Sequence, residues 1–227
     1  GEGQDNRMNI SDFVDVLDDG MPHFDFIMFD ACFMMSVEVA YEVRNYTDYY
    51  IGSPTENPGP GAPYDKVVPY MFKPGAAAQM AEAYFNHYKD NYKAGEGISN
   101  ANWTGGTSIC AVRTDALDDL ADVTGQLLER ADNESMPSFN TVFDYDKRDM
   151  EEGHVGYYDF SQMMEMRLDA DAYVAWKNVF DASIVYWNTT DKNYSMFKRM
   201  FSMEGTNGIT HYIPLSVDSK AAEAYRS

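Results

Sequence analysis

Residues 24–53 read FDFIMFDACFMMSVEVAYEVRNYTDYYIGS, and this stretch decides the fold class. The run at 24–30 is short and mostly apolar, which is typical of a strand covered on both faces. Residues 35–46 place apolar side chains at helical spacing, and 48–53 predict the next strand. Because strand, helix and strand follow one another with short joints, the stretch predicts a βαβ unit whose strands run parallel.

The rest of the chain alternates predicted helices and strands. A helix is expected at 10–20 with Ser11 as its N-cap, and the prolines and glycines of 54–64 predict a loop long enough to carry function. Further patterns predict helices at 76–92, 115–131 (with Asp115 as N-cap), from Asp159 and near 171–182, and strands at 107–113, 183–187 and 208–214. The first half is thus α/β in character and the second is mixed and helix-rich, with a boundary expected near 110–135.

The composition limits the classes of function. The 227 residues are 44% hydrophobic and 15% aromatic, which is enough to build a sizeable core. The net charge of −20 argues against nucleic acid, because phosphate binding relies on clustered Lys and Arg, and it serves either solubility or the steering of cationic partners. No window reaches the ~20 apolar residues of a membrane span. The opening GEGQDNRMN lacks an initiating Met and a signal peptide, so a fragment or processed product is expected.

Cys32 lies just after the first predicted strand and just before the helix, at the edge where open parallel sheets bind ligands. The positive end of the helix dipole would favour a thiolate there, whereas Asp30 on the same side would raise the pKa of the thiol. Asp30 is therefore interpreted as a fixed negative charge that faces a positive group of a substrate. In the alternative interpretation, Cys32 and Cys110 are both small packing residues, since two cysteines make no disulfide scaffold.

A nucleophilic cysteine needs a histidine within hydrogen-bond reach, and none of the four histidines has a spacing that links it to Cys32. His23 precedes the strand that Cys32 follows, and the intervening extended chain spans up to ~30 Å, which places His23 at the wrong end of the sheet. His87 lies in a predicted helix, His154 in a loop and His211 in a predicted strand. The base is therefore expected outside this chain.

Residues 24–61, ending in the loop PTENPGPG, resemble the clostripain family of cysteine peptidases, which are relatives of caspases, gingipains and legumains. The shared pattern is an apolar strand, Asp-Ala-Cys, a VEVAY-like helix, and a strand that ends in Ser before an acidic residue and a Pro-Gly loop. TSICAVRTDALDDL (107–120) and GITHYIP (208–214) look like the family's later elements. The resemblance implies a caspase-like α/β fold, a mostly parallel sheet flanked by helices. Residues 1–115 would carry the C-terminal portion of the peptidase domain with the nucleophile, and 116–227 a helix-rich region with added strands.

The resemblance also implies roles for individual residues. Cys32 would be the nucleophile, Asp30 would line the pocket for the basic side chain before the scissile bond, and Glu56 would form a second wall of that pocket. Ser53, which ends the second strand, is likewise assigned to substrate binding. The implied activity is an endopeptidase that cleaves after Arg, or Lys, in a secreted or cell-envelope protein of a bacterium.

The family's catalytic His stands upstream of the Cys in a His-Gly setting, and its members are cut between the two into light and heavy chains. Nothing in residues 1–31 matches that setting. The resemblance therefore implies a heavy chain that starts at Gly1 and pairs with a light chain from the same precursor, which supplies the His.

Two rival interpretations remain open, a peptidase-like fold without activity and an acidic binding domain in which Cys32 is inert. Some clostripain relatives depend on calcium, and oxygen ligands suit that ion. The stretch DYDKRDMEEG (144–153) offers the carboxylates of Asp144, Asp146, Asp149, Glu151 and Glu152. It lacks the EF-hand glycine at position six, so an acidic surface loop is the preferred interpretation and no metal ligand or other cofactor is assigned.

Overall fold

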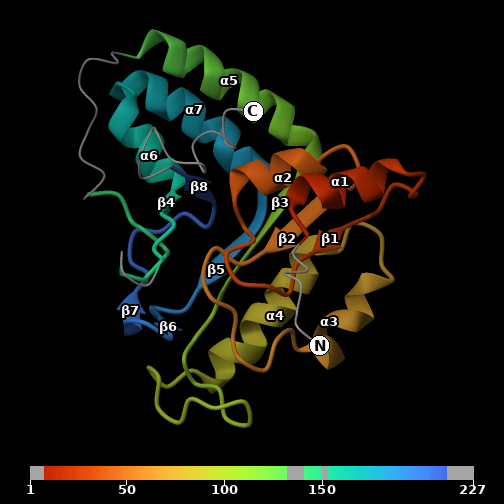
Figure 1. Ribbon diagram of the computed structural model, residues 1–227, viewed down its shortest axis with the longest axis vertical. Helices are drawn as coiled ribbons and strands as arrows, with labels where there is room; N and C mark the ends of the chain where they lie inside the picture. Colours follow the sequence, from red (N-terminus) through yellow and green to blue (C-terminus); the bar gives the residue numbers. More distant parts are fainter. Residues whose placement is uncertain (1–7, 132–140, 150–152, 214–227) are drawn as a thin grey trace, which may run out of the picture.

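The structure is a computed structural model that describes residues 8–131, 141–149 and 153–213. Its centre is a four-stranded sheet in the order β1-β2-β3-β5 (Figure 1). The strands are β1 (Ile27–Met28), β2 (Tyr49–Gly52), β3 (Ser108–Arg113) and β5 (Ile184–Thr189). Two small antiparallel pairs lie outside it, β4 (Tyr157–Asp159) with β8 (Thr210–Tyr212) and β6 (Lys192–Ser195) with β7 (Arg199–Ser202).

Successive side chains of a strand point to opposite sides of the sheet. Because apolar side chains lie on both sides here, helices cover both faces. Tyr50, Cys110 and Val112 pack on one side with the first layer of helices, while Ile51 and Ile109 pack on the other side with the second. The first layer comprises α1 (Ile10–Asp18), α2 (Val37–Val43), α5 (Leu117–Arg130), α6 (Phe160–Arg167) and α7 (Ala170–Ser183), and the second α3 (Tyr64–Met71) and α4 (Ala77–Asn91).

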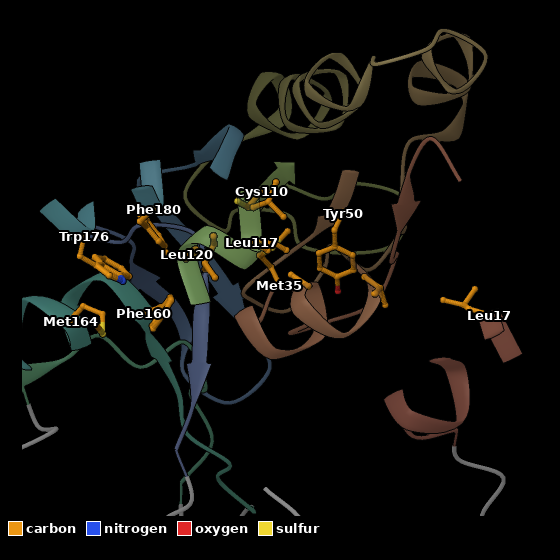
Figure 2. Packing of buried hydrophobic residues seen from close by; sticks show 14 residues of the cluster. Leu17, Met35, Tyr50, Cys110, Leu117, Leu120, Phe160, Met164, Trp176 and Phe180 are labelled. Carbon is orange, nitrogen blue, oxygen red and sulfur yellow. The ribbon is translucent and has the colours of Figure 1, made fainter. Parts of the chain in front are cut away.

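Aromatic side chains from α6 and α7 fill the core of the first layer (Figure 2). The ring of Trp176 is fully buried, with Phe160 edge-on at a centroid distance of 5.1 Å and Phe180 stacked at 4.9 Å. Its indole N–H donates to the Thr124 hydroxyl at 2.8 Å, so the one polar atom of the ring is satisfied. Each such aromatic pair contributes about 0.5–1.5 kcal/mol beyond its area burial.

The predicted α/β fold, a central sheet flanked by helices, is confirmed, and so is the βαβ unit. β1 and β2 pair in parallel with Ile27 opposite Tyr50. In the described residues, however, the sheet is mixed rather than mostly parallel, since β2–β3 and β3–β5 are antiparallel. The reason lies in the connections. Two helices, α3 and α4, lie between β2 and β3, so the chain enters β3 at the same end of the sheet at which it left β2.

Several predicted boundaries shift. The strand expected at 24–30 is reduced to β1, preceded by an isolated bridge between Phe24 and Thr47. Asn9, rather than Ser11, is the N-cap of α1. The helix expected at 115–131 starts as a 3-10 turn, η1 (Thr114–Ala116), and Asp115 pairs with Arg113 instead of capping α5. The loop expected at 54–64 is present as far as Pro63, and the helix that follows it, α3, was missed by the sequence patterns.

The two sides of the division expected at residue 115 share one sheet and one core. β5 lies beyond that position yet pairs with β3, and buried residues from α2 and from α7 belong to the same cluster. Along the described part of the chain, none of the helices combines the length and the apolarity that crossing a bilayer requires.

Candidate active site

Cys32 lies in the loop between β1 and α2, and its side chain is exposed. The helix itself begins later than the sequence suggested, because Ser36 is its N-cap and accepts the N–H of Val39 at 3.2 Å. The thiol is therefore four residues ahead of the cap, too far for the helix dipole to act strongly on it. The hydrogen bond to Sγ comes instead from the backbone N–H of Asn57, at 3.2 Å.

The surroundings of Cys32 raise the pKa of the thiol above its ordinary value. Partial burial is the main cause, and the negative charges of Glu56 and Asp30 add to it. The N–H of Asn57 acts in the opposite direction, because it stabilises the thiolate, but does not outweigh the other effects. The thiol is thus protonated at neutral pH and needs a base to become a nucleophile.

Phe33 fixes the turn that presents the thiol. Its φ of 59° lies in the left-handed region, which costs a bulky residue of order 1–3 kcal/mol and persists only where the surroundings enforce it. Two contacts do so here: the Phe33 N–H donates to the carbonyl of Thr55 at 3.0 Å, and its ring stacks on Tyr157 at 5.2 Å. Strain of this kind next to an exposed thiol is typical of a functional turn.

Asp30 anchors the loop that faces the thiol. Its carboxylate accepts hydrogen bonds from the N–H of Ala62 at 2.8 Å, from the Tyr64 hydroxyl at 3.2 Å and from the side-chain amide of Asn57 at 3.2 Å. The residue remains exposed. Asp30 and Asn57 thus tie residues 57–64 to the end of β1.

Glu56 is directed away from that loop toward the turn between β6 and β7. Its two oxygens accept from the Ser195 hydroxyl and from the N–H of Met196, the latter at 3.1 Å. The carboxylate therefore joins the loop beside Cys32 to a hairpin about 140 residues further along the chain.

Ser53 is buried, with an exposed fraction of 1%. Its hydroxyl lies 3.2 Å from that of Thr55 and 3.1 Å from that of Ser108, so the three hydroxyls form one buried network below the loop. In this arrangement Ser53 shapes the loop from within, and its predicted role in substrate binding stays a prediction.

The four histidines hold other partners, and none of them hydrogen-bonds Sγ of Cys32 in the described residues. His23 lies 2.8 Å from a carboxylate oxygen of Asp48, and His87 packs edge-on against its neighbour Tyr88. His154 contacts Asp144, and His211 lies 2.7 Å from Glu38.

The carboxylates of the acidic stretch face basic groups rather than one another. Asp146 is fully buried and holds Arg148 at 2.8 Å, Asp144 contacts His154, and Asp149 lies 2.7 Å from Lys198. Glu151 and Glu152 lie outside the described residues. Among the residues that are described, no three His, Cys, Asp or Glu side chains converge as a cation would require, so the described carboxylates by themselves do not form a calcium site.

A sizeable cavity lies elsewhere in the described structure. It has a volume of about 680 Å³ and lies between α2, α5 and α6, with a lining that is mainly aliphatic and aromatic and includes neither Cys32 nor Asp30. Cys32 lies outside this cavity, in the loop between β1 and α2.

The sequence singled out Cys32, Asp30 and the loop after β2, which lie together in the structure, but Asn57 and the β6–β7 turn were missed. Asn57 stands next to Glu56 in a loop already singled out, so its amide could have been considered. The turn carries no motif, and its contact with Glu56 joins segments about 140 residues apart. Nothing local in the sequence points to it.

The family model for the clostripain family matches residues 1–227. A cysteine protease from B. fragilis is 37% identical, with a TM-score of 0.89 over 100% of this chain and 93% of that one. A secreted C11 cysteine protease from Bacteroides thetaiotaomicron, solved with an irreversible peptide inhibitor, is 40% identical, with a TM-score of 0.87 over 98% of this chain and 61% of that one.

A third similar structure is an inactive zymogen of a C11 protease from Parabacteroides distasonis, 26% identical with a TM-score of 0.80, covering 96% of this chain and 60% of that one. No curated protein sequence matches. The fold, with its exposed cysteine in the loop after β1, is that of the caspase-like cysteine proteases. Within that class, the chain belongs to the clostripain family.

Proposed function

We propose that this chain carries the nucleophile of a cysteine endopeptidase that cleaves peptides after Arg, and secondarily after Lys. The observation that carries the proposal is the exposed thiol of Cys32, presented by the strained turn at Phe33 and hydrogen-bonded by the N–H of Asn57. An inert packing cysteine would be enclosed by apolar groups, as Cys110 is in β3. The peptide inhibitor bound to the B. thetaiotaomicron relative supports a peptide substrate.

Asp30 is the residue we assign to the basic side chain. Its carboxylate is exposed, lies two residues before Cys32, and is held in place by the loop at 57–64. A guanidinium binds a carboxylate through two parallel hydrogen bonds, whereas an ammonium makes a point contact, so Arg is favoured over Lys. In this assignment Glu56 contributes negative charge to the same region rather than a direct contact, because its carboxylate is directed toward the turn between β6 and β7.

The catalytic His is proposed to come from a light chain of the same precursor. β1 is the edge strand of the described sheet, and Phe26, Ile27, Met28 and Phe29 around it are only partly buried. An apolar edge strand that is left open is a template for pairing with a further strand. A strand placed there would end beside Cys32, which is where the base is needed.

The chemistry follows from these positions. The His would take the proton from Sγ, and the thiolate would attack the carbonyl carbon after the basic residue, forming a C–S bond. Backbone N–H groups, including that of Cys32, would hold the oxyanion. The His would then return the proton to the leaving amine as the C–N bond breaks, and water would hydrolyse the thioester.

Two finer features belong to the same proposal. The secreted relative from B. thetaiotaomicron supports action outside the bacterial cytoplasm, and the zymogen form of the P. distasonis protein supports maturation by proteolysis. The carboxyl groups of Asp144, Asp146 and Asp149 are engaged with basic side chains, so the proposal assigns these three residues no part in catalysis.

Cleavage of peptide amides by the protein containing its upstream segment tests the proposal. Wild-type protein is expected to cleave after Arg, and the Cys32→Ala variant is expected to be inactive while keeping the same thermal unfolding curve. Cleavage by the alanine variant would show that another group is the nucleophile. Absence of cleavage by the wild type, with Cys32 still open to alkylation, would favour the inactive or binding interpretations.

A further inference from the structure

A chain of contacts leads from Cys32 to the turn between β6 and β7. The N–H of Asn57 donates to Sγ at 3.2 Å, and the preceding residue, Glu56, accepts the N–H of Met196 at 3.1 Å. Glu56 also accepts the hydroxyl of Ser195, so one carboxylate holds two consecutive residues of the turn. The turn is thereby held by Glu56, the residue directly before Asn57, whose N–H contacts the thiol.

A second chain of contacts returns from the turn to the other side of Cys32. Lys198, in the same turn, lies 2.7 Å from a carboxylate oxygen of Asp149. The neighbouring Arg148 places its guanidinium carbon 5.9 Å from the centre of the Phe33 ring, within range of a cation–π contact. Phe33 directly follows Cys32. Together the two chains of contacts link the turn to Asn57, which contacts the thiol, and to Phe33, which follows it; the residues of both chains are called the rim below.

The turn presents two large apolar side chains on this rim. Met196 is 77% exposed and Phe197 is 41% exposed. Among the described residues they are the only two large exposed hydrophobic side chains adjacent in sequence. The Phe197 N–H donates back to the Ser195 hydroxyl at 3.2 Å, so the backbone beneath them is ordered by its own hydrogen bonds. Exposed apolar groups held in one place mark an interaction site.

The charged side chains of the rim are engaged with charged partners or with the turn, so Met196 and Phe197 are the surface that remains available to a ligand. Arg148 is paired with Asp146, Lys198 with Asp149, and Glu56 with donors of the turn itself. A ligand that follows the rim past the thiol therefore meets Met196 and Phe197 as unengaged apolar area. The flexible thioether of Met adapts to side chains of different shape.

We propose that Met196 and Phe197 form an apolar specificity subsite, which binds an apolar side chain of the substrate close to the basic residue at the cleavage point. This inference rests on the proposed peptidase function. Glu56 is the positioning residue that holds the subsite against the catalytic loop.

The test uses the protein with its upstream segment and a set of peptides that share Arg at the cleavage point. In each peptide, one of the two residues that precede this Arg is replaced by Leu, Phe, Gly or Asp. The two positions are varied in separate series. Wild-type protein is compared with the double variant Met196→Ser/Phe197→Ser. Val174→Ser is the matched control, because Val174 is 59% exposed on α7 and lies outside the rim.

Wild-type protein is expected to prefer Leu or Phe over Gly at one position by about tenfold in kcat/KM, the usual range for one apolar group in a pocket. The double variant should lose that preference mainly through KM, while Val174→Ser keeps it. The rate of Cys32 alkylation by iodoacetamide should be the same in all three proteins. Met196→Asp provides a gain of function, since it should shift the preference at that position toward Lys or Arg.

The outcomes separate the two proposals. Cleavage after Arg with no apolar preference, or with a preference that survives in the double variant and in Met196→Asp, would overturn the subsite and leave the peptidase function standing. Failure of wild-type protein to cleave any of the peptides would overturn the peptidase function and the subsite with it.

Discussion

Asp30→Asn removes one negative charge from the site. The fold should tolerate this substitution, because the hydrogen bonds to residue 30 can be kept. The new amide oxygen can still accept the N–H of Ala62, which lies 2.8 Å from the carboxylate. The NH2 group of the new asparagine side chain can donate to Oδ1 of Asn57 once the Asn57 amide rotates. This oxygen is buried without a partner in the described structure. The expected cost in unfolding free energy is below about 1 kcal/mol, against about 1–3 kcal/mol for Asp30→Ala, which strands these donors.

The same substitution should move catalysis and thiol reactivity in opposite directions. Loss of a charged hydrogen-bond partner for the guanidinium removes about 1.5–3 kcal/mol, which is about 10- to 150-fold in kcat/KM for Arg substrates. The thiol, by contrast, loses one of the negative charges that raise its pKa. Its alkylation at neutral pH should therefore become slightly faster.

The assay pairs two peptides that differ only in Arg or citrulline at the cleavage point, since citrulline keeps the shape of Arg without its charge. For wild-type protein the ratio of kcat/KM values should strongly favour Arg, and for Asp30→Asn it should approach one. An unchanged ratio in the variant, with alkylation intact, would refute the role of Asp30 in recognition and reduce it to an anchor of the loop.

Three further predictions follow from buried or perturbed groups. Cys110→Ala should leave kcat/KM unchanged and cost about 1 kcal/mol of stability, because this thiol is fully buried in β3 and its pKa is strongly raised by burial; a loss of activity would implicate it in catalysis. Alkylation of Cys32 in the isolated chain should increase with pH and show no plateau below about pH 9, because only the thiolate reacts and its pKa is raised; a plateau near neutrality would reveal an internal base. Asp159→Ala should lower Tm by roughly 6–12 °C, which corresponds to about 3 kcal/mol of unfolding free energy. The reason is that this fully buried carboxylate caps α6 and accepts hydrogen bonds from the Tyr145 hydroxyl and the Asn207 N–H, both at 2.7 Å. A decrease of less than about 2 °C would contradict that account.

The elements that local patterns define could be predicted from the sequence. The βαβ unit follows from an apolar run, a helical repeat and a second strand within thirty residues, and the structure has them in that order. α3 was missed because Pro69 lies inside it, and an internal proline normally argues against a helix. β4 and the β6–β7 hairpin are three- and four-residue strands whose pairing, rather than composition, defines them.

The sequence singled out the candidate nucleophile Cys32, whose role stays a prediction, but it indicated little of the surroundings of that residue. Cys32 stands out because it follows a strand end, and Asp30 because it shares that end. The support they receive from Asn57, Phe33 and the β6–β7 turn depends on loop conformation and on contacts between distant segments. The direction in which a loop carboxylate such as Glu56 points is set by the donors it meets in the fold, and no spacing rule gives it.

Labelling with a chloromethyl ketone that carries Arg tests most directly whether Cys32 is a nucleophile completed by a second chain. The reagent should add to Cys32, as located by peptide mass mapping, rapidly when the upstream segment is present and slowly in the isolated chain. Competing Arg peptide should slow the reaction. An adduct on Cys110, or equal labelling rates with and without the upstream segment, would contradict the assignment.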